Sequence, residues 1–148
     1  MDAEAKIKSL LEGYPVVVVQ PVQWGEQDPL GHVNHVTYFR WYETARIAYF
    51  RRIGLMDMHR HERIGPILAS VSNDYRHQLT YPDTVNIGVR ISRIGRSSLD
   101  MEHRIVSQNE QRVSQAAEGG CESQTVSRDL RACLGNRGGG FQSGRRCD

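Results

Sequence analysis

The sequence predicts an α+β fold, in which one antiparallel sheet packs around a single buried helix. Three observations carry this prediction: a long segment with helical spacing that is apolar around most of its circumference, one strand-like segment before it, and a run of turn-linked strand-like segments after it. The chain has 148 residues, of which 39% are apolar and 24% are charged. This composition and length are typical of one globular domain with its own core.

Before the long helix, the sequence predicts a short helix, a strand and a loop. Residues 1–13 predict a short helix that ends at Gly13. Residues 14–24 are rich in β-branched side chains and predict a strand, in which Pro21 favours a sheet edge or a bulge because proline cannot donate to the ladder. Residues 25–34 contain several turn-forming residues and predict a loop.

Residues 35–53 predict the central helix, with Asn34 as its N-cap and a glycine directly after its last periodic residue. Because it is apolar around most of its circumference, we expect this helix to be buried. Glu43 and Arg46 lie on its apolar side, three residues apart, and are predicted to form a structural pair. The polar side is a narrow stripe of Thr37, Arg40, Thr44 and Arg51.

Three strand-like segments follow a polar connection at residues 57–65. They cover residues 66–79, 84–94 and 97–107. The second alternates apolar and polar residues, which is the period of a half-buried antiparallel strand. A helix followed by hairpin-linked strands gives the α+β class stated above.

Residues 24–46 (WGEQDPLGHVNHVTYFRWYETAR) are the candidate functional segment. Asp28 lies in a glycine-containing turn, seven residues before His35 at the helix start. The first backbone N–H groups of a helix have no internal partner and can polarise a carbonyl and hold an oxyanion. A carboxylate beside them can attack the carbonyl or activate water. The plainer alternatives are that Asp28 only forms the turn and that His35 contributes only its backbone.

This segment resembles the signature of the hotdog-fold acyl-CoA thioesterases of the 4-hydroxybenzoyl-CoA thioesterase type, which is roughly W-G-D-x-D-x-x-G-H-V-N-N-x-x-Y-x-x-x-x-E-x-A-R. The resemblance extends over about residues 14–110, and eleven of the 23 signature positions match. The matching residues are Trp24, Gly25, Asp28, Gly31, His32, Val33, Asn34, Tyr38, Glu43, Ala45 and Arg46. Three positions depart from the signature or from its Tol-Pal-associated branch: Glu26 replaces the first acid, His35 the second asparagine, and Trp24 that branch's tyrosine.

The resemblance implies a hotdog fold that hydrolyses an acyl-CoA to the free acid and CoA, without a cofactor. It places the catalytic carboxylate on Asp28 and the oxyanion donor on the backbone N–H of His35, whose side chain also acts in one branch of the family. It also implies an active site at a dimer interface, in a homodimer or homotetramer. The implied substrate-binding residues are Gly31, His32, Asn34, Val36, Arg93, Arg96 and Ser97.

Several alternatives stay open at this point. His32 either contacts the ligand or fixes the turn. Arg93, Arg96 and Ser97 either meet the phosphates of CoA or form a solvated hairpin. For the whole chain, the alternatives are a hotdog protein that binds an acyl thioester without hydrolysing it, and an inactive product with a disrupted C-terminus.

The last part of the chain has a different character. We predict a hotdog domain over residues 1–113 and an atypical tail over residues 114–148, where no alternation extends over five positions. A shifted reading frame near codon 113 and a natural, mostly disordered extension both explain the tail. Either origin would remove a strand and leave a sheet edge unpaired. Sequencing the gene tests the first: a single insertion or deletion that restores valine-rich codons supports it, and a clean frame excludes it.

Composition excludes several classes of partner. Nineteen basic and seventeen acidic residues leave a net charge of +2, which favours neither nucleic acid nor an anionic membrane. The longest apolar run, residues 15–19, is too short to span a bilayer, and no signal peptide is visible. The spacing of His59 and His61 is only weakly suggestive of a metal, so we predict none. We expect reduced thiols in a cytoplasmic protein at Cys121, Cys133 and Cys147.

Overall fold

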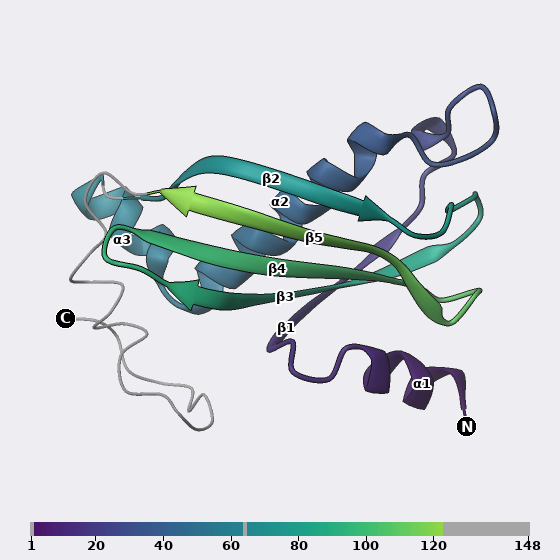
Figure 1. Cartoon of the computed structure of the whole chain (residues 1–148), viewed down its shortest axis with the longest axis horizontal. Coiled ribbons are helices and arrows are strands. Elements are labelled where there is room, and N and C mark those ends of the chain that lie inside the picture. The colour runs from purple at the N-terminus through teal and green to yellow at the C-terminus, as the bar shows by residue number, and fades with distance from the viewer. Residues whose placement is uncertain (1, 64, 123–148) are drawn as a thin grey trace.

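The computed structural model describes residues 2–63 and 65–122. Its helices are α1 (Ala3–Leu10), the 3-10 helix η1 (Trp24–Glu26), α2 (His35–Arg52) and α3 (Leu55–Glu62). Its strands are β1 (Val16–Pro21), β2 (Ile67–Tyr75), β3 (Thr84–Ile94), β4 (Ser98–Ser107) and β5 (Arg112–Glu122). The predicted α+β class is confirmed, and Figure 1 shows the sheet lying across the long helix α2.

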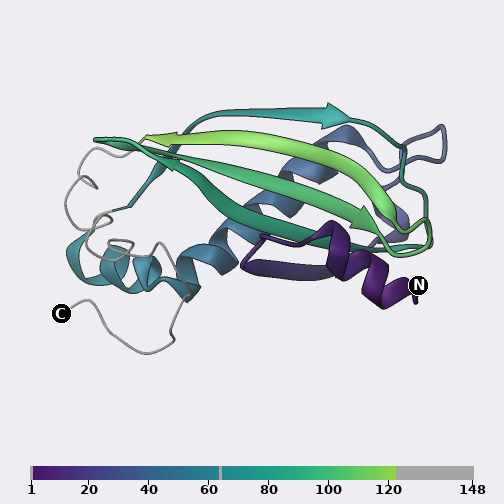
Figure 2. The same cartoon turned by 60° about the horizontal axis from the view of Figure 1, so that its bottom comes forward.

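The five strands form one antiparallel sheet in the order β1-β3-β4-β5-β2. The sheet curves around α2, as the two views in Figures 1 and 2 show. Strands β1 and β2 are its two edges within the described residues, and this agrees with the edge position predicted from Pro21. Strand β2 follows α3 in the chain but reaches the sheet only through β5, its sole strand neighbour there.

Helix α2 forms the centre of the core. The side-chain oxygen of Asn34 accepts the N–H of Val36 at 3.0 Å, so the predicted N-cap is confirmed. One face of α2 packs on β1 and β3, and Tyr42 of the same face reaches His103 of β4. Burial of one large apolar side chain in this core stabilises the fold by about 1.5–3 kcal/mol. The buried residues of this face include Tyr38, Trp41, Tyr42, Ala45, Tyr49 and Phe50, and their sheet partners include Val85, Ile87, Val89, Met101 and Ile105.

Two details predicted for α2 are wrong. Thr37 is buried, not on the polar stripe, because it lies one and two turns before Trp41 and Ala45 in the row that faces the sheet. Glu43 is exposed and Arg46 half-buried, and the two form no ion pair within the part of the chain that the structure describes. The sheet covers only one side of α2, so the side that carries Glu43 stays open.

The polar connection predicted at residues 57–65 contains a helix. Gly54, with φ of 80°, turns the chain between α2 and α3, and Leu55 is the one residue of α3 that is fully buried. A single buried side chain gives no periodic signal, which is why the helix was missed. His59 and His61 are exposed on it.

The predicted strand over residues 84–94 matches β3, and β4 begins one residue later than predicted. Strand β2 ends at Tyr75 instead of residue 79. The N–H groups of Arg76 and His77 both donate to the carbonyl oxygen of Ser114, at 3.1 and 3.0 Å. Two donors on one acceptor break the regular ladder, so the chain leaves the sheet there.

Strand β5 corrects the expectation of a missing strand. Its backbone runs on from Arg112 past Ser114 to Glu122 and pairs with β4 on one side and β2 on the other. The sequence of this strand has low β propensity, but two neighbouring strands supply its backbone hydrogen bonds. The reading-frame hypothesis stays a prediction, and residues 123–148, with Cys133 and Cys147, lie outside the described residues.

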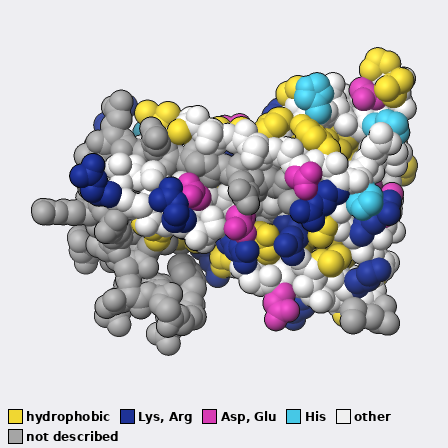
Figure 3. All heavy atoms as spheres, viewed as in Figure 1, with side chains coloured by type: hydrophobic (Ala, Val, Ile, Leu, Met, Phe, Trp, Pro, Cys, Tyr) yellow, Lys and Arg dark blue, Asp and Glu magenta, His cyan; other side chains and the backbone are white. Residues whose placement is uncertain are grey.

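The face of the sheet away from α2 carries charged residues. Arg90 Nη2 lies 2.5 Å from Glu102 Oε2 across β3 and β4, and Figure 3 shows basic and acidic side chains interspersed over this face. Tyr14 covers Gly88 on the same face, where an added Cβ would lie 2.8 Å from the Tyr14 ring. This surface has the mixed charge typical of a solvated sheet face.

A buried histidine makes the stability of the fold depend on pH. His103 on β4 is 2% exposed and lies against Tyr42, with ring centroids 5.0 Å apart. Burial, and then the nearby charge of Arg46, lower the pKa of His103 to about 4. The unfolded chain, with a histidine pKa of about 6.5, therefore takes up a proton first as the pH falls. The neutral His103 ring therefore makes its full contribution to the free energy of unfolding above about pH 6.5. This contribution is lost as the pH falls from about 6.5 to about 4.

We predict that the free energy of unfolding falls on acidification from about pH 7.5 to about pH 5, and that about 2 kcal/mol of this fall disappears in His103→Gln. Urea unfolding at the two pH values measures the difference. His61→Gln, at an exposed histidine of α3, is the control and should keep the wild-type fall. An equal fall in wild type and His103→Gln would contradict the prediction.

Candidate active site

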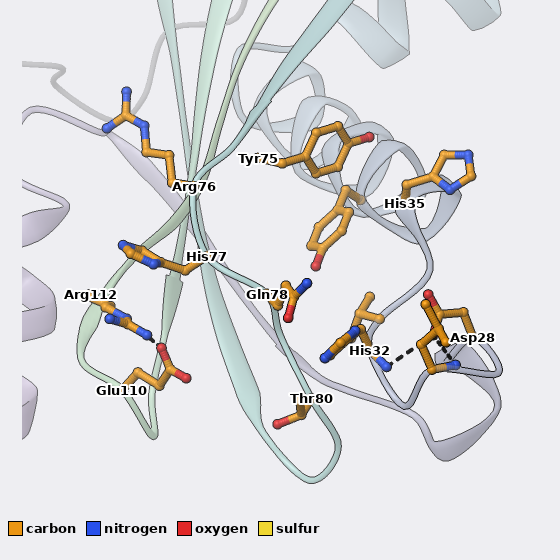
Figure 4. Close-up of a pocket in the computed structure, with 13 residues that line it drawn as sticks. Asp28, His32, His35, Tyr75, Arg76, His77, Gln78, Thr80, Glu110 and Arg112 are labelled. Carbon is orange, nitrogen blue, oxygen red and sulfur yellow. Dashed lines mark hydrogen bonds and ion pairs between the residues drawn. The ribbon is translucent and has the colours of Figure 1, made fainter.

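The candidate site is a hollow of about 790 Å³ beside the first turn of α2, a size typical of small-molecule sites. Three segments line it: the loop and first turn of α2, the chain after β2, and the β4–β5 turn (Figure 4). Its lining residues are Asp28, Leu30, His32, Val33, His35, Tyr38, Tyr75, Arg76, His77, Gln78, Thr80, Glu110 and Arg112.

Backbone hydrogen bonds shape the loop that carries Asp28. The N–H of Asp28 donates to the carbonyl oxygen of His32 at 2.7 Å, and the N–H of Gly31 donates back to Asp28 at 3.0 Å. Gly31 has φ of 79°, which glycine adopts without strain. The N–H of Asn34 then donates to Glu26 at 2.8 Å, so the loop closes directly in front of α2.

The Asp28 carboxylate is held by its own loop. Its Oδ1 atom accepts the N–H groups of Leu30 at 2.8 Å and His32 at 3.2 Å (Figure 4). Within the described residues Oδ2 accepts no hydrogen bond. The side chain is half-buried, so one oxygen is fixed while the other stays available to a reactant in the hollow.

The first turn of α2 begins at His35, which lines the hollow. Asn34 accepts the N–H of Val36 on its side chain and the N–H of Thr37 on its carbonyl, at 3.0 and 2.9 Å. The N–H of His35, at the first helical position, has no partner within the helix. The helix dipole adds partial positive charge at this point, which stabilises an oxyanion.

The structure brings part of the predicted site together. Asp28, His32 and His35 line the hollow, while Gly31 shapes the loop and Asn34 caps α2. Val36 lies on the same first turn with 52% of its surface exposed. In Figure 4 the His35 ring stands apart from Asp28, and no hydrogen bond joins them.

Arg93, Arg96 and Ser97 lie elsewhere in the same chain. Arg93 lies near the end of β3, and Arg96 and Ser97 form the β3–β4 turn, which Figure 1 shows at the end of the sheet opposite the Asp28 loop. Arg93 Nε lies 2.5 Å from Asp100 Oδ2, so its charge is already paired within the hairpin. The fold of a single chain therefore does not bring this predicted phosphate-binding group to the hollow.

Sequence reasoning missed two walls of the hollow. One is the segment after β2, and the other is the β4–β5 turn with Glu110 and Arg112. The Tyr75 ring packs edge-on against Tyr38 of α2, with centroids 5.6 Å apart. The sequence does carry a signal for the first wall, because residues 76–78 are all polar. The strand predicted over residues 66–79 includes these residues and so hides that signal.

Metal ligands are not gathered in the part of the chain that the structure describes, since no group of three or more His, Cys, Asp or Glu side chains there lies close enough to hold an ion. Among the same residues, no helix has both the length and the apolar character needed to cross a bilayer. The charged and imidazole side chains that line the hollow are those of Asp28, Glu110, Arg76, Arg112, His32, His35 and His77.

Comparison with known proteins agrees with this geometry. Residues 22–133 match the family model of the Thioesterase-like superfamily. YsmA of Bacillus subtilis (strain 168) is 33% identical over 82 residues, which are 55% of this chain. That match spans 54% of YsmA, about half the length of this curated relative.

Solved structures resemble most of the chain. The PA2801 protein of Pseudomonas aeruginosa has 29% identity and a TM-score of 0.69, over 80% of this chain and 96% of that one. A thioesterase of Thermus thermophilus, complexed with coenzyme A and Zn, has 33% identity and a TM-score of 0.67, over 78% and 89%. A mutant 4-hydroxybenzoyl-CoA thioesterase with its 4-hydroxybenzoyl-CoA, at 21% identity and a TM-score of 0.68, covers 73% and 82% and shares the fold.

The sheet wrapped around α2 is thus the hotdog fold predicted from the sequence. Since the family model covers three quarters of the sequence, including the Asp28 loop and all of α2, the chain belongs to the Thioesterase-like superfamily.

Proposed function

We propose that this protein is an acyl-CoA thioesterase that converts an acyl-CoA and water into the free acid and CoA, with Asp28 as the catalytic carboxylate. One observation carries the proposal: Asp28, whose Oδ1 is fixed by two backbone N–H groups, lines the same hollow as His35, whose N–H has no partner within α2. Membership of the superfamily and the likeness to a thioesterase that binds coenzyme A support it.

The proposed reaction uses the helix start and the carboxylate together. The N–H of His35 donates to the thioester oxygen and stabilises the negative charge that develops there. Asp28 either attacks the carbonyl carbon, giving an anhydride that water then opens, or removes a proton from an attacking water. In both routes the C–S bond breaks, the CoA thiolate leaves and is protonated, and one water molecule is consumed as the free acid forms.

The edge strand β2 supports the proposal of a homodimer. It exposes four large apolar side chains along a strand edge that has no neighbour within the described residues, an arrangement that favours pairing with a second chain. If two copies of β2 pair antiparallel, the start of β2 in one copy lies beside the end of β2 in the other. The β3–β4 turn of one copy then lies on the same side of the dimer as the hollow of the other copy. The exposed residues are Ile67, Leu68, Val71 and Tyr75.

The catalytic role of Asp28 predicts that Asp28→Asn lowers kcat by at least about 100-fold, the scale expected when a catalytic acid or base is removed. Asparagine keeps a side-chain oxygen for the N–H groups of Leu30 and His32, so the loop and the melting temperature should change little. Thiol release from a panel of acyl-CoAs measures kcat.

Asp57→Asn is the matched control, because Asp57 is an exposed carboxylate of α3 paired only with Arg60 among the described residues. Wild-type turnover by Asp28→Asn would eliminate the mechanism. If wild type binds acyl-CoAs but releases no thiol from them, the protein is instead a non-hydrolytic acyl-thioester-binding protein.

The dimer predicts that Val71→Lys, in the middle of β2, gives a folded monomer with reduced kcat/KM. A lysine there places like charges opposite each other across the proposed two-fold axis. Val19→Lys is the control, because Val19 is 60% exposed on β1, the other edge of the sheet. Sedimentation equilibrium measures the mass of each variant, and a monomeric wild type would rule out the proposed dimer.

A further inference from the structure

The hollow has a basic side as well as a catalytic side. Arg76 and His77 come from the segment after β2, and Arg112 opens β5. Figure 4 shows these three side chains on one side of the segment after β2, and Asp28 and His32 on its other side. Neither the superfamily match nor the signature in residues 24–46 assigns them a role.

Both arginines keep donors for a ligand. Arg76 Nε lies 3.0 Å from Asp74 Oδ2, and Arg112 Nε lies 2.5 Å from Glu110 Oε2. The terminal guanidinium nitrogens of both residues make no hydrogen bond within the described residues. The two side chains are 52% and 51% exposed, and exposed ion pairs of this kind contribute little and exchange partners readily.

The backbone fixes the arginines relative to each other. The N–H groups of Arg76 and His77 both donate to the carbonyl of Ser114, which lies two residues after Arg112 on β5. Ser114 is fully buried, so this connection does not open to solvent. The basic group is therefore set on the sheet rather than on a free loop, and a preorganised group binds a ligand with a smaller entropic cost.

We propose that Arg76, His77 and Arg112 bind phosphate groups of coenzyme A while its thioester lies beside Asp28; this inference rests on the proposed function. In an acyl-CoA the pantetheine arm separates the thioester from the phosphates. A site that binds the whole molecule therefore needs a catalytic region for the thioester and a separate basic region for the phosphates. The hollow supplies them, with the carboxylate and the helix start on one side and the cations on the other. The planar guanidinium donors of arginine match phosphate oxygens bidentately.

The test compares two substrates with the same acyl group, acyl-CoA and acyl-pantetheine, which has no phosphate. For Arg76→Gln/Arg112→Gln we expect KM to rise about tenfold with acyl-CoA, at unchanged kcat, and to stay at the wild-type value with acyl-pantetheine. Arg60→Gln is the matched control, because Arg60 is an exposed arginine of α3 in a similar ion pair, with Asp57. An unchanged KM for acyl-CoA in the double variant would overturn the proposal.

Binding of free CoA, measured by calorimetry, separates this inference from the proposed function. A wild type that binds CoA about tenfold more tightly than the double variant supports the phosphate site even if no acyl-CoA is hydrolysed. Equal dissociation constants of wild type and the double variant for CoA overturn the proposal. A second double variant, Arg93→Gln/Arg96→Gln, is measured in parallel. If only this variant binds CoA more weakly than wild type, the phosphates lie at the β3–β4 turn and the proposal is also overturned.

Glu110→Gln provides an independent arm if the double variant does not fold. It removes the carboxylate that pairs with Arg112 and repels phosphate. We expect tighter binding of CoA by this variant, and unchanged or weaker binding would count against the proposal.

Discussion

Backbone hydrogen bonds between segments far apart in the sequence hold the candidate site together. The N–H of Val33, in the Asp28 loop, donates to the carbonyl oxygen of Leu79 at 2.8 Å. Leu79 belongs to the segment after β2, whose own N–H groups at residues 76 and 77 donate to Ser114 of β5. The three walls of the hollow are thus joined in series, from the loop to the chain after β2 and then to the sheet. Because these bonds involve only the main chain, the lining side chains remain available for chemistry.

The parts of the fold that the sequence predicted well are those with a strong periodic or capping signal. Strand β3 alternates Val85, Ile87 and Val89 towards the core, and its predicted bounds agree with the structure. The start of α2 was predicted from one asparagine, whose side chain does cap the helix. The loop of Asp28 was predicted from spacing and from a resemblance, since turn chemistry and helix starts are local properties of the chain.

The parts that could not be predicted depend on contacts between distant segments. Strand β5 carries little β propensity of its own and forms because strands lie on both of its sides. The basic side of the hollow arises where the end of β2 and the start of β5 meet, a meeting that no local pattern reports. The exposed apolar edge of β2 has the same origin, because the order of strands in the sheet decides which strand is left at the edge.

The central place of β5 also has a consequence for how the chain is made. Strand β2 spans residues 67–75, yet its strand partner spans residues 112–122, so β2 has no strand to join until those later residues have left the ribosome. Through that interval its apolar side chains stay exposed and the support of the Asp28 loop through Leu79 is not yet anchored to the sheet. The Asp28 loop is synthesised before the sheet strands β2 to β5, but its final geometry depends on β5, the last of these strands to be made.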